Sequence, residues 1–196
     1  MSSIKKLNTS LPYIILIILT VLLFLLPESL TNTLEYQRNA VSQLQLWRLF
    51  SAHLLHTNHW HLLMNCAGLA LVMLLHGRYS RHFPLWIQFS IAALLISSGL
   101  YFFSPQMQHY VGLSGVLHAL LIWGACMDIR CKARGGWLLL LLLCTKVIYE
   151  QWQGPDPQLA ALINANVAID AHLYGIIAGS LLWLVSSITL RSKNTR

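Results

Sequence analysis

The chain has 196 residues, of which 56% are hydrophobic and only 10% are charged, and its formal net charge is +7. Soluble domains average about 45–50% apolar and about 25% charged residues, so this composition excludes a fully solvated domain. High hydrophobicity with few charges also excludes intrinsic disorder. We therefore predict an all-α integral membrane protein with a single domain over residues 1–196.

Six apolar segments follow one another along the chain and predict six membrane-spanning helices. They lie at about 11–26, 60–75, 84–103, 111–127, 137–149 and 171–190. A bilayer core about 30 Å thick needs about 20 helical residues, so flanking residues must complete several of these spans. Lys5 and Lys6 precede the first segment, but no small-residue cleavage site follows it. We interpret it as an uncleaved span rather than a signal peptide.

The basic residues separate by side when the spans alternate from a cytoplasmic N-terminus. Ten of the thirteen fall in cytoplasmic segments: Lys5, Lys6, Arg78, Arg81, Arg130, Lys132, Arg134, Arg191, Lys193 and Arg196. Of the six acidic residues, only Asp128 falls on that side. This bias follows the positive-inside rule and predicts that both termini are cytoplasmic. The net charge therefore records topology, and we predict no nucleic-acid partner.

Polar residues inside apolar segments are the candidate functional residues, because lipid makes them costly. The first cluster, Gly112-Leu113-Ser114-Gly115, opens the fourth segment on the outer side of the membrane. Glycines allow close backbone approach, and the free amides of a helix N-terminus favour an oxyanion. A hydroxyl beside such a backbone suits acyl transfer. The alternative is a serine N-cap with packing glycines.

The second cluster, Ala171-His172-Leu173-Tyr174-Gly175, opens the last segment at a depth similar to that of Ser114. His172, Gly175 and Gly179 share one helical face, and small residues let another helix approach that face closely. If the approaching helix carries Ser114, the two side chains form a nucleophile with its general base. The alternative is a histidine that is hydrogen-bonded at a helix end.

The third cluster contains His53, His56, His59, His61 and Asn65, before and within the second segment. His61 and Asn65 are four residues apart on one face, and both can donate hydrogen bonds to a developing oxyanion. Four histidines within nine residues are also compatible with zinc. No HExxH pattern follows, so we predict no metal site. A histidine-rich membrane protein that binds metal stays as an alternative.

Together with Trp47-Arg48-Leu49-Phe50-Ser51 in the first outer loop, these clusters resemble the rhomboid family of intramembrane serine proteases. The resemblance implies a six-helix rhomboid-like bundle in which Ser114 is the nucleophile and His172 its base, without a carboxylate partner and without a cofactor. Asp170 lies two residues from His172, on another helical face, so we do not expect it to join them. The other implied site residues are His61, Asn65, Gly112 and Leu113 at the oxyanion and substrate site, and His118, Gly115, Gly175 and His56 in support.

Two positions depart from the common rhomboid pattern. His118 stands where many rhomboids carry a tyrosine one turn after the serine, and we expect it to stack on or polarise His172. In Ala52-His53, the histidine comes one residue later than in many members of the family.

The stretch Ser114-Gly115-Val116-Leu117-His118 and the lack of an extra domain look most like the rhombosortase branch of the family, found in Gram-negative bacteria. That resemblance implies an inner-membrane enzyme whose active site opens to the periplasm. Its partners would be the lipid bilayer and membrane-anchored proteins ending in Gly-Gly, an apolar helix and a basic tail. Hydrolysis of that sorting signal and transfer of the new end to a lipid amine both stay open. So does a non-catalytic rhomboid-like protein that binds client helices.

Overall fold

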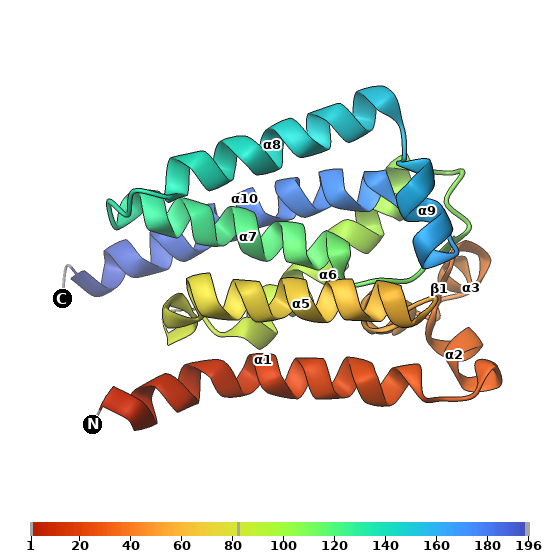
Figure 1. The fold of residues 1–196 in the computed structure, drawn as a ribbon, viewed down its shortest axis with the longest axis horizontal. Coiled ribbons are helices and arrows are strands. Elements are labelled where there is room, and N and C mark those ends of the chain that lie inside the picture. Colours follow the sequence, from red (N-terminus) through yellow and green to blue (C-terminus); the bar gives the residue numbers. More distant parts are fainter. Residues whose placement is uncertain (1, 82, 195–196) are drawn as a thin grey trace.

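The structure is a computed structural model that describes residues 2–81 and 83–194, and most of that length is helical (Figure 1). A long helix occupies most of each of the six predicted segments, which confirms the all-α class. These helices are α1 (Ser2–Phe24), α5 (His59–His76), α6 (Leu85–Phe103), α7 (Ser114–Arg130), α8 (Gly136–Gln153) and α10 (Ile169–Asn194). Arg196, one of the basic residues behind the topology prediction, lies outside the described residues.

Three helical stretches in the described part of the chain are long and apolar enough to cross a membrane. They are Leu85–Phe103, Ile169–Ser187 and His59–Arg81, the last of which joins α5 to the 3-10 helix η2 (Gly77–Arg81). A shorter apolar stretch covers Thr9–Phe24. These stretches support a multi-pass membrane protein. Six crossings and cytoplasmic termini remain predictions.

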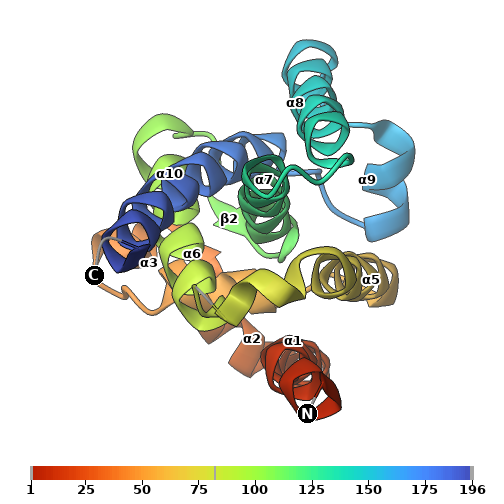
Figure 2. The same cartoon turned by 90° about the vertical axis from the view of Figure 1, so that its left-hand side faces the viewer.

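Helix α7 occupies the centre of the bundle. In the end-on view of Figure 2 it is surrounded by α5, α6, α8 and α10, whereas α1 lies outside α5. Eleven of its seventeen residues are buried, including Trp123, the largest fully buried side chain among the described residues. By contrast, α8 buries only three of its eighteen residues. A helix enclosed by protein does not have to be apolar for lipid, so α7 can carry the small and polar residues of the first cluster.

Small residues set the close contact between α7 and α10. A Cβ atom at Gly175 would collide with the backbone oxygen of Gly115, and one at Gly179 would collide with the backbone of Ala119. A Cβ at Gly115 would lie 2.9 Å from the backbone oxygen of Ala171. The glycine face of the last segment therefore packs on the helix that begins with the serine cluster, and larger residues there would push the two helices apart.

Short elements close the end of the bundle where α7 and α10 begin (Figure 1, right). They are α2 (Glu28–Leu34), β1 (Tyr36–Gln37), α3 (Arg38–Ser42), α4 (Arg48–Ser51), the 3-10 turn η1 (Ala52–Leu54), β2 (His109–Tyr110) and α9 (Pro157–Ile163). Strands β1 and β2 pair in antiparallel fashion, with Tyr36 opposite Tyr110. The guanidinium of buried Arg48 donates to the backbone oxygens of Asn32 and Glu35 at 2.8 and 2.7 Å. Because a buried charge needs such partners, Arg48 holds the first outer connection in a folded shape.

Candidate active site

The first contact of the site joins the N-terminal ends of α7 and α10. Ser114 is the first residue of α7, and its Oγ lies 3.0 Å from Nε2 of His172. His172 is only 5% exposed, and Ser114 is partly exposed. This distance is within hydrogen-bond range for a nucleophile and its general base. The glycine contacts between α7 and α10 bring the two side chains together.

The backbone turns sharply just before Ser114. Gly112 has a φ of +131°, which L side chains rarely adopt, and its N–H donates to the Ala52 carbonyl oxygen at 3.1 Å. The Gly112 amide is therefore engaged, and this glycine shapes the turn. Leu113 occupies the N-cap position without a side-chain cap, so the alternative in which Ser114 is the N-cap is wrong. The turn also explains why the helix begins at Ser114 and not at Val111, where the predicted segment starts.

Helix α5 contributes His61 and Asn65, which are buried and one turn apart. Nδ1 of His61 lies 3.1 Å from the Thr57 hydroxyl, while Nε2 is turned towards Gly112. The Asn65 amide nitrogen is buried, and no side chain or backbone group of the described residues accepts its hydrogen bond. An unpaired buried donor costs about 1–3 kcal/mol. The Asn65 N–H therefore suits an acceptor that arrives with a substrate.

His118 lies one turn after Ser114 and stacks on His172. The ring centroids are 4.3 Å apart and the ring planes differ by 22°. Nδ1 of His118 lies 2.8 Å from the Ser114 carbonyl oxygen, and a carbonyl only accepts, so Nδ1 donates. Nε2 then accepts from Lys146 Nζ, which is 3.3 Å away. His118 therefore supports the His172 ring from one face.

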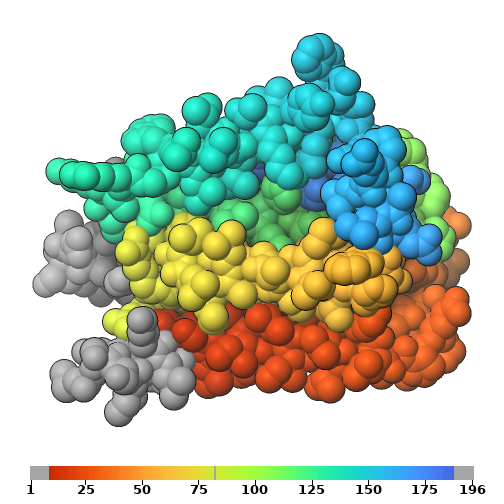
Figure 3. Space-filling view, viewed as in Figure 1, coloured from red at the N-terminus to blue at the C-terminus, as the bar shows by residue number. Residues whose placement is uncertain are grey.

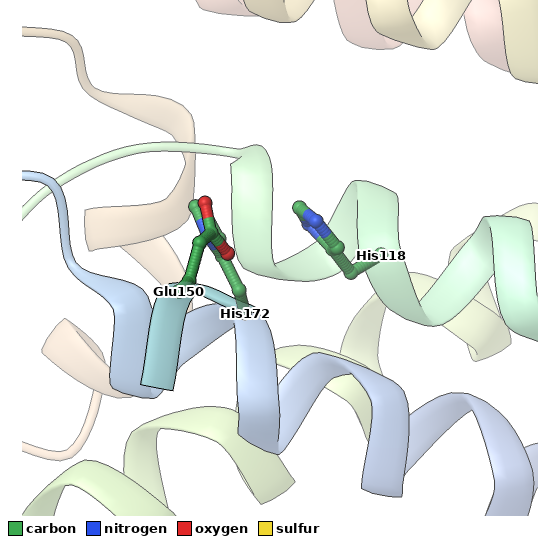
Figure 4. Close-up of side chains that lie close together, drawn as sticks. All are labelled: His118, Glu150 and His172. Carbon is green, nitrogen blue, oxygen red and sulfur yellow. The ribbon is translucent and has the colours of Figure 1, made fainter. Parts of the chain in front are cut away.

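A carboxylate missed by the sequence analysis also contacts His172. Oε2 of Glu150, near the end of α8, lies 2.9 Å from Nδ1 of His172, and Lys146 Nζ lies 2.7 Å from Oε1. Figure 4 shows Glu150 and His172 close together, with His118 beside them on α7. The resemblance implied a histidine without a carboxylate partner, and the structure differs on this point. The sequence feature that could have identified Glu150 is its i,i+4 pairing with Lys146 at the end of an apolar segment.

The other polar residues of the sequence analysis lie apart from this cluster. Asp170 accepts from Ser104 and Gln106, and among the described residues it forms no hydrogen bond with His172. His53 is fully buried, and burial lowers its pKa to about 4. His56 packs edge-on against His61 with centroids 5.0 Å apart, and burial lowers its pKa to about 3. Both histidines are therefore neutral near pH 7.

Metal binding is the remaining alternative for the histidines. Within the described ranges, the one group of three or more histidine, cysteine or acidic residues with ligand atoms within 4.8 Å of one another is His118, Glu150 and His172. The two rings are stacked with planes 22° apart, so their in-plane lone pairs lie in separate, nearly parallel planes and do not converge on one point. Both nitrogens of His172 already have partners, and Lys146 occupies Nε2 of His118. The geometry suits proton transfer better than metal coordination.

A cavity of about 370 Å³ opens beside Ser114 at this end of the bundle. Its polar lining comes from Glu35, Thr57, His61, Gln106, His109 and Asn166. Apolar residues on either side of β2, at the end of α9 and in the connection after it complete the wall. A polar cavity gives water a route to the serine from an otherwise apolar bundle, and proteolysis inside a membrane requires such a route.

The Rhomboid domain family model matches residues 43–188, a range that contains Ser114, His172, Glu150, His118, His61 and Asn65. The chain belongs to the rhomboid family. A search of the curated proteins found no match. Membership of this family supports a membrane-embedded, protease-like function, a lipid environment and membrane substrates for this rhomboid.

Proposed function

We propose that this rhomboid is an intramembrane serine endopeptidase with Ser114 as nucleophile and His172 as general base. The observation that carries the proposal is the 3.0 Å contact between Ser114 Oγ and His172 Nε2 beside a polar cavity. Nε2 takes the hydroxyl proton as Oγ attacks a substrate carbonyl, and then gives it to the leaving amine. Water resolves the resulting ester with the same base.

The tetrahedral intermediate needs donors for its oxyanion. Asn65 offers a buried N–H without a partner in the described residues, and Nε2 of His61 lies beside the turn at Gly112. The first-turn amides of α7 add backbone donors, because they have no acceptor within their own helix. His61 lines the cavity beside Ser114, and Asn65 lies one turn after His61 on the same helix, so we assign these donors to the oxyanion.

A substrate helix has a route to the site between α5 and α8. In Figure 3 the green surface of α7 lies recessed between the yellow surface of α5 and the teal surface of α8. An intact helix hides its carbonyls in hydrogen bonds, so it must unwind before attack. Each glycine makes unwinding easier by about 1 kcal/mol relative to alanine.

We therefore propose substrates that end in Gly-Gly, an apolar helix and a basic tail, cut near the periplasmic face of a bacterial inner membrane. The resemblance to rhombosortases supports this substrate class. An amine of a lipid head group would resolve the acyl-enzyme by transfer instead of hydrolysis. Mass spectrometry of the new C-terminus separates a free carboxylate from an amide.

The test is cleavage of a reporter that carries such a tail by the membrane-embedded enzyme. The wild type is expected to cut the Gly-Gly reporter and to cut a Leu-Leu version much more slowly, while Ser114→Ala cuts neither. Ser180→Ala is the matched control, because the Ser180 hydroxyl is exposed and bonds only within its own helix, to Ile176 at 2.9 Å. Equal cleavage of both reporters contradicts the substrate class. Cleavage by Ser114→Ala contradicts the proposed function.

A further inference from the structure

The site contains a closed ring of hydrogen bonds that runs through three helices. Ser114 Oγ contacts His172 Nε2, and His172 Nδ1 contacts Glu150. Lys146 contacts both Glu150 and His118, and His118 returns to the backbone oxygen of Ser114. Five residues of α7, α8 and α10 are thereby linked without a break (Figure 4 shows three of them).

This cycle of hydrogen bonds determines which nitrogen of His172 carries the proton. A carboxylate oxygen only accepts, so Nδ1 of His172 must donate to Glu150 Oε2. Nε2 is then left with its lone pair directed at the Ser114 hydroxyl, which is the tautomer that a general base requires. The acid side chain thus determines the state of the base.

We propose that Glu150 is a positioning residue that orients His172 and stabilises the imidazolium formed when Ser114 loses its proton. The inference rests on the proposed function. In the same proposal, Lys146 holds the Glu150 carboxylate through Oε1, so that Oε2 remains hydrogen-bonded to the His172 imidazole. The proton moves from Ser114 Oγ to Nε2 of His172, while the Nδ1 proton stays on His172.

A simple ion pair between Lys146 and Glu150 does not account for this arrangement. Exposed i,i+4 pairs contribute little to stability and leave the carboxylate free to turn. The Glu150 side chain is only 14% exposed, and its two oxygens are divided between Lys146 and His172. His118 stacks on the His172 ring and limits its tilt. The imidazole of His172 is therefore held at its face by His118, at Nδ1 by Glu150 and at Nε2 by Ser114.

The charges around His172 determine the direction of the expected pH effect. Glu150 and Lys146 face it from α8, His118 from α7 and His61 from α5, while Asp170 on its own helix is directed at Ser104. The Glu150 carboxylate contacts the ring directly, and Lys146 lies one hydrogen bond further away. The nearer charge interacts more strongly with the ring in a poorly polarisable site, so removing it should disfavour the imidazolium, whereas removing Lys146 should favour it.

The experiment measures kcat and KM of the purified full-length enzyme against pH, with a Gly-Gly reporter in lipid vesicles. Glu150→Gln is expected to lower kcat by about 10²–10⁴-fold with little change in KM, as for the acid of a soluble triad. The acid limb of its pH–kcat profile should move to lower pH, because the His172 imidazolium forms less readily without the carboxylate. Lys146→Met should move the acid limb to higher pH, since the carboxylate then acts unopposed.

Asp170→Asn is the matched control, because it removes a carboxylate two residues from His172 that does not contact the ring. This variant should leave the pH–kcat profile unchanged. Acid limbs that coincide with wild type in both α8 variants would overturn the inference, even if their activity is low. Should Glu150→Gln fail to fold, the upward shift in Lys146→Met decides alone. Retained activity in Ser114→Ala would instead refute the proposed function, so the two failures are distinguishable.

Discussion

Two buried histidines contact carboxylates at opposite ends of the bundle, and their surroundings differ. Where α7 begins, His172 has Glu150 on one nitrogen and the hydroxyl of Ser114 on the other. Where α7 ends, Nε2 of His76 lies 3.2 Å from Asp128. A buried histidine–carboxylate pair is therefore present twice, but only the first pair contacts a nucleophile in the described residues.

The second pair, His76 and Asp128, takes part in contacts between helices. Asp128 also accepts from Arg78 at 2.8 Å and from the Tyr79 hydroxyl at 2.6 Å, so its oxygens bind three partners. The ring of His76 lies so close to Gly124 that a Cβ there would collide with it. This cluster joins α5 and η2 to α7. A histidine–carboxylate pair becomes a candidate active site only when a hydroxyl and a cavity occupy its other side.

Removal of each histidine should separate the two ends most clearly. We expect His172→Ala to lower reporter cleavage by about 10⁴–10⁶-fold, as loss of the base does in soluble serine proteases. His76→Ala should leave kcat/KM within about threefold of wild type for the folded fraction and lower the melting temperature. The measurement is cleavage per folded enzyme in vesicles. Full activity in His172→Ala, or its selective loss in His76→Ala, would break the comparison.

The oxyanion donors should give the next largest effect. Loss of one donor in a soluble protease costs about 2.7–4 kcal/mol, so Asn65→Ala should lower kcat by about 10²–10³-fold with KM nearly unchanged. Because its N–H has no partner among the described residues, thermal stability should not fall. Steady-state kinetics and thermal melting check both expectations together. A stability loss that accounts for the whole activity loss would place Asn65 in packing instead.

Asp128→Asn tests the structural end alone. The change weakens charge-assisted hydrogen bonds to three side chains, so we expect a stability loss of about 1–3 kcal/mol. The kcat of the folded enzyme should stay within about twofold of wild type. Unfolding in mild detergent, followed by intrinsic fluorescence, measures the first quantity. A kcat loss as large as that of Glu150→Gln would show that the two ends are coupled.

His53 is a buried histidine whose hydrogen-bond partners are neutral groups: Ser97 Oγ at 3.0 Å, the Ala93 oxygen at 3.2 Å and the Tyr110 hydroxyl at 3.5 Å. Burial lowers its pKa from 6.5 to about 4, so the unfolded chain binds a proton there first as pH falls. Stability is complete above about pH 6.5 and should decline by about 1–2 kcal/mol by pH 5. The slope of melting temperature against pH should be smaller in His53→Gln. An unchanged slope would contradict a buried neutral ring.

The sequence predicted those features that follow from local pattern. Hydropathy located the six long helices because apolar runs of that length have few other solutions. The glycines at 115, 175 and 179 indicated a close contact between two segments, and Ser114 and His172 meet because both lie in the first turn of a helix at the same end of the bundle. Spacing along one helix was also sufficient to expect His118 near the pair.

The sequence did not predict the contact between Glu150 and His172, because that contact depends on how α8 is rotated against α7 and α10. It lies 22 residues from His172 along the chain, and α8 has too few buried residues to define its inner face by hydropathy. The family resemblance also directed attention to a pair without a carboxylate. The start of α7 was placed at Val111 because hydropathy does not register the positive φ of Gly112. Both errors concern backbone or rotational geometry that a linear pattern does not contain.

The most direct test of the central claim is labelling of the folded enzyme with a fluorophosphonate, followed by mass spectrometry of the modified peptide. Wild type should carry a single adduct at Ser114, and His172→Ala should carry little or none, because the hydroxyl reacts only when Nε2 removes its proton. An adduct at another residue, or equal labelling of Ser114 in His172→Ala, would contradict the account.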